Sequence, residues 1–264
     1  MNMQTPQKRL EVMAGKTSRF RFRSILMVVA ALIMLKIGFP ETWSQELKSP
    51  AVPGGIAPAT SHPGEQALNR LLEGNERYVA GKAIHPDQTI KRRIDLANGQ
   101  TPFAVVLTCS DSRVAPELFF DQGLGDLFVI RNAGNVLDDH VIGTMEYAVE
   151  HLHVSLIIVV GHEKCGAVTA AVAGGEVSGH IRSLVDDIEP AVEESKDLPG
   201  DKVDNAVRAN ALRAAEILNH VEPILKEAVG DNKLMIVAAR YDLDTGRVEI
   251  LKPSKSNNSN TQTP

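Results

Sequence analysis

Cysteine and aromatic residues are scarce in this chain of 264 residues. It contains two cysteines and one tryptophan, and Phe, Trp and Tyr together make up 4% of the residues. Two cysteines allow one disulfide or one shared metal site, and their number alone does not decide between these. The length suits one α/β domain of good size, or at most two small domains.

Positive charge is also scarce after the first forty residues. Residues 1–40 hold seven Lys or Arg and one Glu, whereas the remainder holds 21 basic and 32 acidic residues, a net charge of −11. Proteins that bind nucleic acid use Lys and Arg to face phosphates. The acidic body of this chain therefore argues against a nucleic-acid partner.

No apolar run is long enough to cross a bilayer comfortably. The longest, Ile25–Leu35, has eleven residues and follows a cluster of Lys and Arg. This pattern is typical of a secretory signal, and a buried core helix is the weaker alternative because basic residues bracket the run. We expect residues 1–40 to be a signal peptide or a membrane anchor. The protein would then be exported, periplasmic or luminal, and it would contact a membrane only through this segment if the segment stays uncleaved.

The rest of the chain divides by composition. Residues 41–62 are rich in Pro, Gly, Ser and Ala without periodicity, which predicts a linker. The polar segment 253–264 predicts a disordered tail. Between them, residues 63–252 form a single predicted domain without internal repeats.

Helical and strand patterns alternate within this domain. Four runs rich in Val, Ile and Leu predict strands buried on both faces, hence parallel: 103–108, 126–132, 155–161 and 233–243. Helical spacing of apolar residues predicts helices at 65–81, 138–152 and 204–220, with Asp138 or Asp139 as the N-cap of the second. Residues 245–251 predict a hairpin return to an edge strand. The expected fold is therefore α/β, a mostly parallel central sheet flanked by helices, with an N-terminal helical arm.

Both cysteines follow predicted strands or begin a helix near one. Cys109 comes directly after the first strand, His162 after the third, and Cys165 begins a likely helical segment. Parallel strands bring their carboxyl ends to one edge of a sheet, so these residues can meet. Two thiolates and an imidazole form a set that zinc prefers, and three protein ligands are typical of a catalytic zinc site. A disulfide between the cysteines is the weaker alternative, because it leaves His162 unexplained.

Asp111 and Arg113 follow Cys109 at spacings of two and four residues. If the backbone stays extended, all three side chains point to one side. Asp111 would then take the fourth zinc position or, paired with Arg113, accept a hydrogen bond from a zinc-bound water. An ordinary surface ion pair is the alternative for these two residues taken alone.

Four stretches together resemble the β-class carbonic anhydrases: "CSDSRV", "GDLFVIRNAGNV", "MEYAVEHL" and "IIVVGHEKCGAV". The resemblance runs in order over roughly residues 65–251. It implies reversible hydration of carbon dioxide to bicarbonate and a proton, by a zinc-bound hydroxide that an Asp111–Arg113 dyad orients. It also implies Zn²⁺ held by Cys109, His162 and Cys165, and a homodimer or homotetramer with the site near the subunit interface.

Two other functions stay open. One is hydrolysis of CS2 or COS on the same zinc site, and the other is a non-catalytic zinc-binding interaction module. The intact Asp111–Arg113 pair argues against the second. Near the site, Arg131 is expected to brace a loop or the dimer, and Gly134 to give tight packing or a backbone donor.

Overall fold

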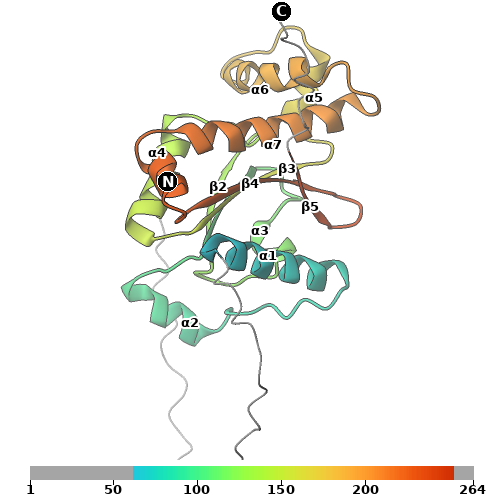
Figure 1. Ribbon diagram of the computed structural model, residues 1–264. Coiled ribbons are helices and arrows are strands. Elements are labelled where there is room, and N and C mark those ends of the chain that lie inside the picture. Colours follow the sequence, from blue (N-terminus) through green and yellow to red (C-terminus); the bar gives the residue numbers. More distant parts are fainter. Residues whose placement is uncertain (1–61, 253–264) are drawn as a thin grey trace, which may run out of the picture. The chain divides into compact units, whose positions relative to one another are not determined.

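The computed structural model describes residues 62–252, which are built around one five-stranded sheet. Its strands are β1 (Ala104–Cys109), β2 (Leu127–Asn132), β3 (Leu156–His162), β4 (Met235–Tyr241) and β5 (Val248–Ile250). They lie in the order β2-β1-β3-β4-β5 (Figure 1). The first four are parallel and β5 pairs antiparallel with β4, which confirms the mostly parallel sheet and the hairpin return.

The strands β1 and β3 both lie inside the sheet, and their burial explains why their sequences are continuous apolar runs. Every residue of β1 and of β3 is buried, as expected for parallel strands covered on both faces. Each predicted strand overlaps an observed one. Cys109 and His162, expected just after their strands, are in fact the last residues of β1 and β3, so the backbone ladder itself places them.

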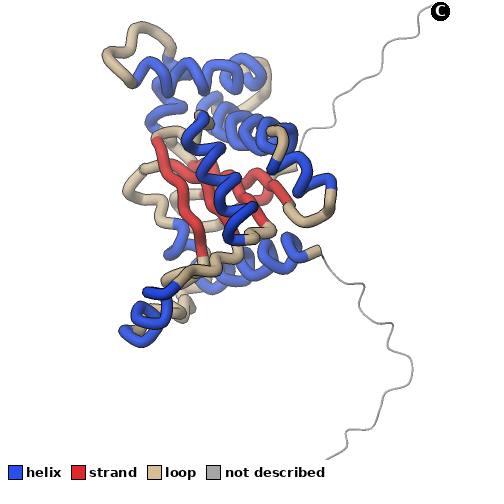
Figure 2. The backbone as a smooth tube through the Cα atoms, turned by 90° about the vertical axis from the view of Figure 1, so that its left-hand side faces the viewer, coloured by secondary structure: helices blue, strands red, loops and turns tan. Residues whose placement is uncertain are grey.

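Helices cover both faces of the sheet (Figures 1 and 2). They are α1 (Pro63–Val79), α2 (Ile90–Asp95), the 3₁₀ turn η2 (Leu96–Asn98), α3 (Pro116–Phe119), α4 (Asp139–Leu152), α5 (Gly166–Ala173), α6 (Ile181–Ser195), α7 (Lys202–His220) and α8 (Ile224–Gly230). Buried side chains of α1 and α3 pack on one face, and those of α4, α7 and α8 pack on the other. Alternate residues of β1 and β3 enter the two cores.

The ends of several helices follow local sequence rules. The Asp138 carboxylate accepts a hydrogen bond from the N–H of Val141 at 2.7 Å, which confirms an N-cap at the predicted start of α4. Asp201 caps α7 in the same way, so that this helix begins at Lys202, two residues before the predicted start. The expected N-terminal helical arm is α1, whose first residue is Pro63, a good first helical position for proline.

A third apolar cluster lies beyond the carboxyl ends of the strands. Helices α5, α6 and α7 enclose it, and α5 and α6 lie together above α7 in Figure 1. It contains Cys109 and Cys165 together with Val185, Ile188 and Val207. The predicted elements did not include α6. This helix supplies Val185 and Ile188, so it closes one side of the cysteine cluster.

Residues 1–40, nearly all of the predicted linker and the 253–264 tail lie outside the described residues, so the four-part division of the chain stays a prediction. Within residues 62–252, we find no helix with the length and apolarity needed to cross a bilayer.

Candidate metal centre

The structure brings Cys109, His162 and Cys165 together at one edge of the sheet. β1 and β3 are neighbours, with Thr108 opposite Val160, so their last residues lie at the same edge of the sheet and are offset by one position. Cys165 stands directly before α5. The three potential ligand atoms, two thiol sulfurs and an imidazole nitrogen, all lie within 4.8 Å of one another, and all three residues are buried.

The spacing of the two sulfurs fits a tetrahedral metal. The Sγ atoms of Cys109 and Cys165 are 4.0 Å apart, and both thiols are free. Two zinc–sulfur bonds of about 2.3 Å at a tetrahedral angle put sulfurs about 3.8 Å apart, whereas a disulfide needs about 2.05 Å. The donor set and its spacing therefore fit zinc, and the two thiols are not joined.

His162 offers a free lone pair to this cluster. Its Nδ1 lies 2.8 Å from the carbonyl oxygen of Glu163. Because a carbonyl only accepts, Nδ1 carries the hydrogen and Nε2 is left with a lone pair. The ring is completely buried, and Nε2 has no hydrogen-bond partner in the described chain. A buried, unpartnered nitrogen facing two sulfurs is what a metal site requires.

The two thiols shift each other's pKa in opposite directions. The hydrogen bond from Cys165 lowers the pKa of Cys109 against the effect of burial, and the N–H of Gly134, 3.4 Å from its sulfur, helps. The pKa of Cys165 is raised by Cys109 and by burial, although the N–H groups of Ala167 and Val168 act in the opposite direction. The α5 N-terminus therefore favours a thiolate, as expected, but the neighbouring sulfur and burial together outweigh it.

Asp111 and Arg113 form a close ion pair beside the cluster. The backbone N–H and Nε of Arg113 both donate to Asp111 Oδ1 at 2.9 Å, and Nη2 donates to Oδ2 at 2.7 Å. Oδ2 lies 3.9 Å from His162 Nε2. Arg113 holds the pKa of Asp111 far below its usual range, so the carboxylate stays ionised.

The route to this pairing differs from the expected one. The backbone does not stay extended, because the N–H of Val114 donates to the carbonyl of Asp111 at 3.0 Å and closes a turn. The Asp111 carboxylate also accepts from the backbone of Arg113, a local pattern common for Asp in turns. The turn, rather than an extended strand, therefore folds Arg113 back onto Asp111.

Two further residues hold the loops around the cluster. Arg131 Nε donates to the Cys109 carbonyl at 3.0 Å and Nη2 donates to the Asp111 carbonyl at 2.8 Å, so Arg131 braces this loop. Asn210 Nδ2 donates to the carbonyl of Gly134 at 2.8 Å. Asn210 was missed in the sequence, where an asparagine within a predicted helix gives no hint of a partner 76 positions away.

Comparison with known proteins agrees with this geometry. The family model described as carbonic anhydrase matches residues 104–248. Carbonic anhydrase 2 of Mycobacterium tuberculosis is 44% identical over 185 residues, which cover 69% of this chain and 89% of that protein. The carbonic anhydrase of Mycolicibacterium smegmatis is 42% identical over 188 residues, covering 70% and 91%.

Solved structures give the same result at lower identity. A tetrameric β-carbonic anhydrase of Sordaria macrospora has a TM-score of 0.57 at 26% identity and covers 70% of this chain and 97% of its own. A Coccomyxa β-carbonic anhydrase, solved with acetazolamide, has a TM-score of 0.57 at 27% identity and covers 70% and 86%. The chain belongs to the β-class carbonic anhydrase family.

Proposed function

We propose that this protein catalyses the reversible hydration of carbon dioxide to bicarbonate and a proton. The observation that carries the proposal is the buried, unpartnered Nε2 of His162, which faces two free thiols next to an Arg-paired carboxylate. Family membership supports the same reaction. Water adds its oxygen to the carbon of carbon dioxide, and one proton leaves to solvent, so the reaction is balanced without a further reactant.

Cys109, His162 and Cys165 would hold Zn²⁺ in this reaction. Their side chains supply two sulfurs and one nitrogen, and zinc prefers such ligands. When bound, zinc lowers the pKa of water from about 15.7 towards about 7 and so provides a nucleophile at neutral pH. The chain contributes a rigid, buried ligand set and one carboxylate beside it.

Asp111 is the proposed orienting group, and Arg113 fixes it. An ionised carboxylate can only accept hydrogen bonds, so Asp111 accepts one from the attacking hydroxyl and aims its lone pair at the carbon. Arg113 occupies both carboxylate oxygens from one side, which keeps Asp111 ionised and restricts its rotation.

A second copy of the chain is the proposed partner. β2 is an edge strand whose residues are only half-buried, with one exposed. No residue of α2 is buried, and Ile90 and Ile94 on this helix are 71% and 60% exposed. Such apolar surface next to a free strand edge is typical of a protein interface. A homodimer would cover it, and two dimers could pair into a homotetramer.

We also propose that the protein is exported, with residues 1–40 as the signal peptide or membrane anchor. Residues 41–62 would be the linker, 63–252 the catalytic domain and 253–264 the tail. Cell fractionation tests this proposal directly. Protein found with the cytoplasmic fraction, with residues 1–40 still attached, would refute it.

The activity is tested by zinc analysis and by stopped-flow measurement of acidification in carbon dioxide solution with a pH indicator. We expect one zinc per chain and fast acidification, which Asp111→Asn reduces at least about tenfold. Asp186→Asn is the matched control, because Asp186 forms a similar carboxylate–Arg pair, at 2.6 Å, on the surface of α6.

Zinc binding without acidification at pH 7 or 8.5 would contradict the proposal and favour a non-catalytic zinc-binding module. COS and CS2 are assayed in parallel. If COS or CS2 is turned over faster than carbon dioxide, that compound is the preferred substrate, and the proposed metal site stays the same.

A further inference from the structure

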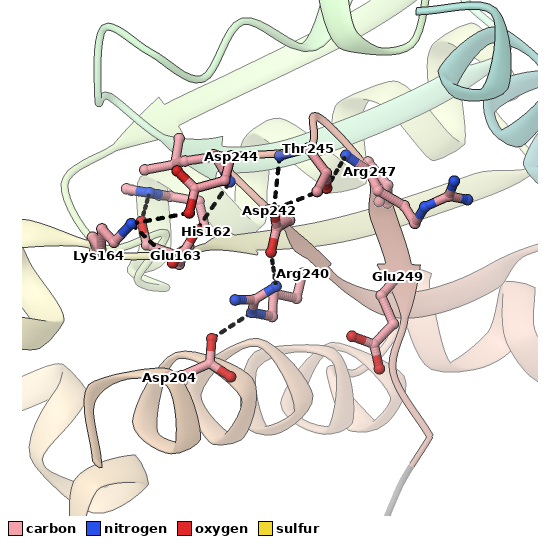
Figure 3. A network of polar contacts seen from close by, with 12 residues as sticks. His162, Glu163, Lys164, Asp204, Arg240, Asp242, Asp244, Thr245, Arg247 and Glu249 are labelled. Atoms are coloured by element: carbon pink, nitrogen blue, oxygen red, sulfur yellow. Dashed lines mark hydrogen bonds and ion pairs between the residues drawn. The ribbon is translucent and has the colours of Figure 1, made fainter. Parts of the chain in front are cut away.

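The turn between two of the proposed metal ligands is held from outside by the hairpin that joins β4 to β5. Glu163 and Lys164 make up this turn, and Lys164 has a positive φ of 54°. Figure 3 shows His162, this turn and the hairpin residues converging in one polar network. None of the three proposed metal ligands lies in the hairpin, so its side-chain contacts reach the site through the turn.

The backbone of Glu163 lies between the His162 ring and the sheet. Its carbonyl receives the Nδ1–H of His162 at 2.8 Å, and its own N–H donates to the carbonyl of Tyr241, the last residue of β4, at 3.0 Å. The backbone position of Glu163, held by its own N–H, therefore decides where the ring hydrogen bond ends. Through that bond, it decides how His162 Nε2 faces the two sulfurs.

The Glu163 side chain ties the same residue to the hairpin. Its Oε2 accepts a hydrogen bond from the backbone N–H of Leu243 at 3.3 Å, and its Oε1 lies 3.1 Å from Lys164 Nζ (Figure 3). Lys164 Nζ in turn lies 3.3 Å from Asp244 Oδ2. The Glu163 side chain is only 18% exposed, so this carboxylate is not a freely solvated surface group.

The hairpin is a firm attachment point. Asp242 Oδ1 accepts from the N–H of Thr245 at 2.9 Å and from its hydroxyl at 2.8 Å, which closes the turn. Arg240 donates to the other oxygen of Asp242 at 3.0 Å and also pairs with Asp204 on α7. The N–H of Leu243 is therefore presented by a hairpin that is anchored to the sheet and to a long helix.

We propose that Glu163 is a positioning residue for the metal site: its carboxylate fastens the His162–Cys165 turn to the β4–β5 hairpin and so fixes the orientation of the His162 ring. The inference rests on the proposed zinc site and adds a residue that does not touch the metal. Groups that orient a metal-binding histidine typically change metal affinity about 10- to 100-fold when they are removed.

The test is the rate at which zinc leaves the holoenzyme for an excess of a chromogenic chelator. We expect Glu163→Ala to lose zinc at least about tenfold faster than the wild type. Glu163→Gln should stay within about threefold of the wild type, because its amide oxygen still accepts from the Leu243 N–H. Asp231→Ala is the matched control: Asp231 also pairs with a nearby lysine, Lys233, at 2.8 Å, but it precedes β4 at the opposite end of that strand.

Three results would overturn the proposal. One is a rate of zinc loss from Glu163→Ala within twofold of the wild type. Another is equal acceleration in Glu163→Gln and Glu163→Ala, which would assign the effect to charge rather than to the hydrogen bond. The third is faster zinc loss in Glu163→Ala together with a matching loss of thermal stability in the metal-free protein, which would indicate general destabilisation. Wild-type protein that holds no zinc would refute the metal site itself, and this is a separate observation from any difference between variants.

Discussion

Asn75 tests how much the contacts between α1 and the β4–β5 hairpin contribute to the stability of the domain. Its Nδ2 donates to the carbonyls of Phe119 and Gly246 at 2.9 and 2.8 Å, and its Oδ1 accepts from the N–H of Val248 at 2.9 Å. The residue is 4% exposed. One residue of α1 thus satisfies three backbone groups of α3 and of the β4–β5 hairpin, the hairpin that also holds Glu163.

Replacing Asn75 with alanine leaves two carbonyls and one N–H without their partner in a buried place. An unsatisfied buried group costs about 1–3 kcal/mol, and a carbonyl with a second lone pair lies at the lower end. We therefore expect Asn75→Ala to lower the free energy of unfolding by about 3–5 kcal/mol. This is a large part of the roughly 5–15 kcal/mol that keeps a domain folded.

The assay is urea unfolding at pH 7 with zinc in excess and at one protein concentration, since ligand and self-association both shift apparent stability. Asn219→Ala is the control, because the Asn219 amide makes a single bond, to the Ala215 carbonyl at 2.8 Å within α7. That variant should lose no more than about 1 kcal/mol. Asn75→Asp keeps one acceptor but sets a carboxylate against two carbonyls, so it should be no more stable than Asn75→Ala. A loss below about 1 kcal/mol in Asn75→Ala, with an unchanged urea dependence, would refute the reasoning.

Three further predictions follow from contacts described above or from similar local geometry. Gly74→Ala should destabilise the protein by more than about 2 kcal/mol in the same assay, because a Cβ at this position would lie 1.8 Å from the Phe120 carbonyl oxygen. Gly143→Ala is the comparison: a Cβ there meets open space on a helical backbone, so this variant should be more stable than the wild type by about 0.5–1 kcal/mol. Arg131→Met should lower carbon dioxide hydration about 10- to 100-fold in stopped-flow assays, because it removes both donors to the loop that carries the first sulfur ligand. The N–H and hydroxyl of the hairpin threonine lower the pKa of Asp242 to about 2, so this carboxylate contributes stability above its unfolded pKa near 4 and loses it as the pH falls towards 2. In metal-free reduced protein, Asp242→Asn should therefore lose about 1–2 kcal/mol less between pH 5 and 2 than the wild type, and parallel declines would contradict this.

The strands and the meeting of the three donors were predictable because they follow from local patterns. Continuous apolar runs identify β1 and β3, and parallel pairing forces Cys109 and His162 to the same edge of the sheet. The helix α6 was missed although Val185 and Ile188 recur at helical spacing, and Pro190 within it reads as a helix breaker.

Contacts that depend on turns could not be predicted from the sequence. The Asp111–Arg113 pair was expected from an extended backbone and instead depends on a turn, whose hydrogen bonds no residue spacing reveals. The bond between Glu163 and the N–H of Leu243 joins positions 80 apart and involves a backbone donor, which carries no residue-specific pattern.

The three proposed ligands differ in how firmly the fold holds them, and this difference bears on metal exchange. Cys109 and His162 end fully buried strands, so moving either one would disturb the ladder of the sheet. Cys165 follows a two-residue turn and stands directly before the eight-residue helix α5. We therefore expect Cys165 to be the ligand that shifts most readily when an ion is exchanged. The rate of metal exchange would then depend on this turn and on its attachment to the hairpin through Glu163, while the sheet holds the other two donors in place.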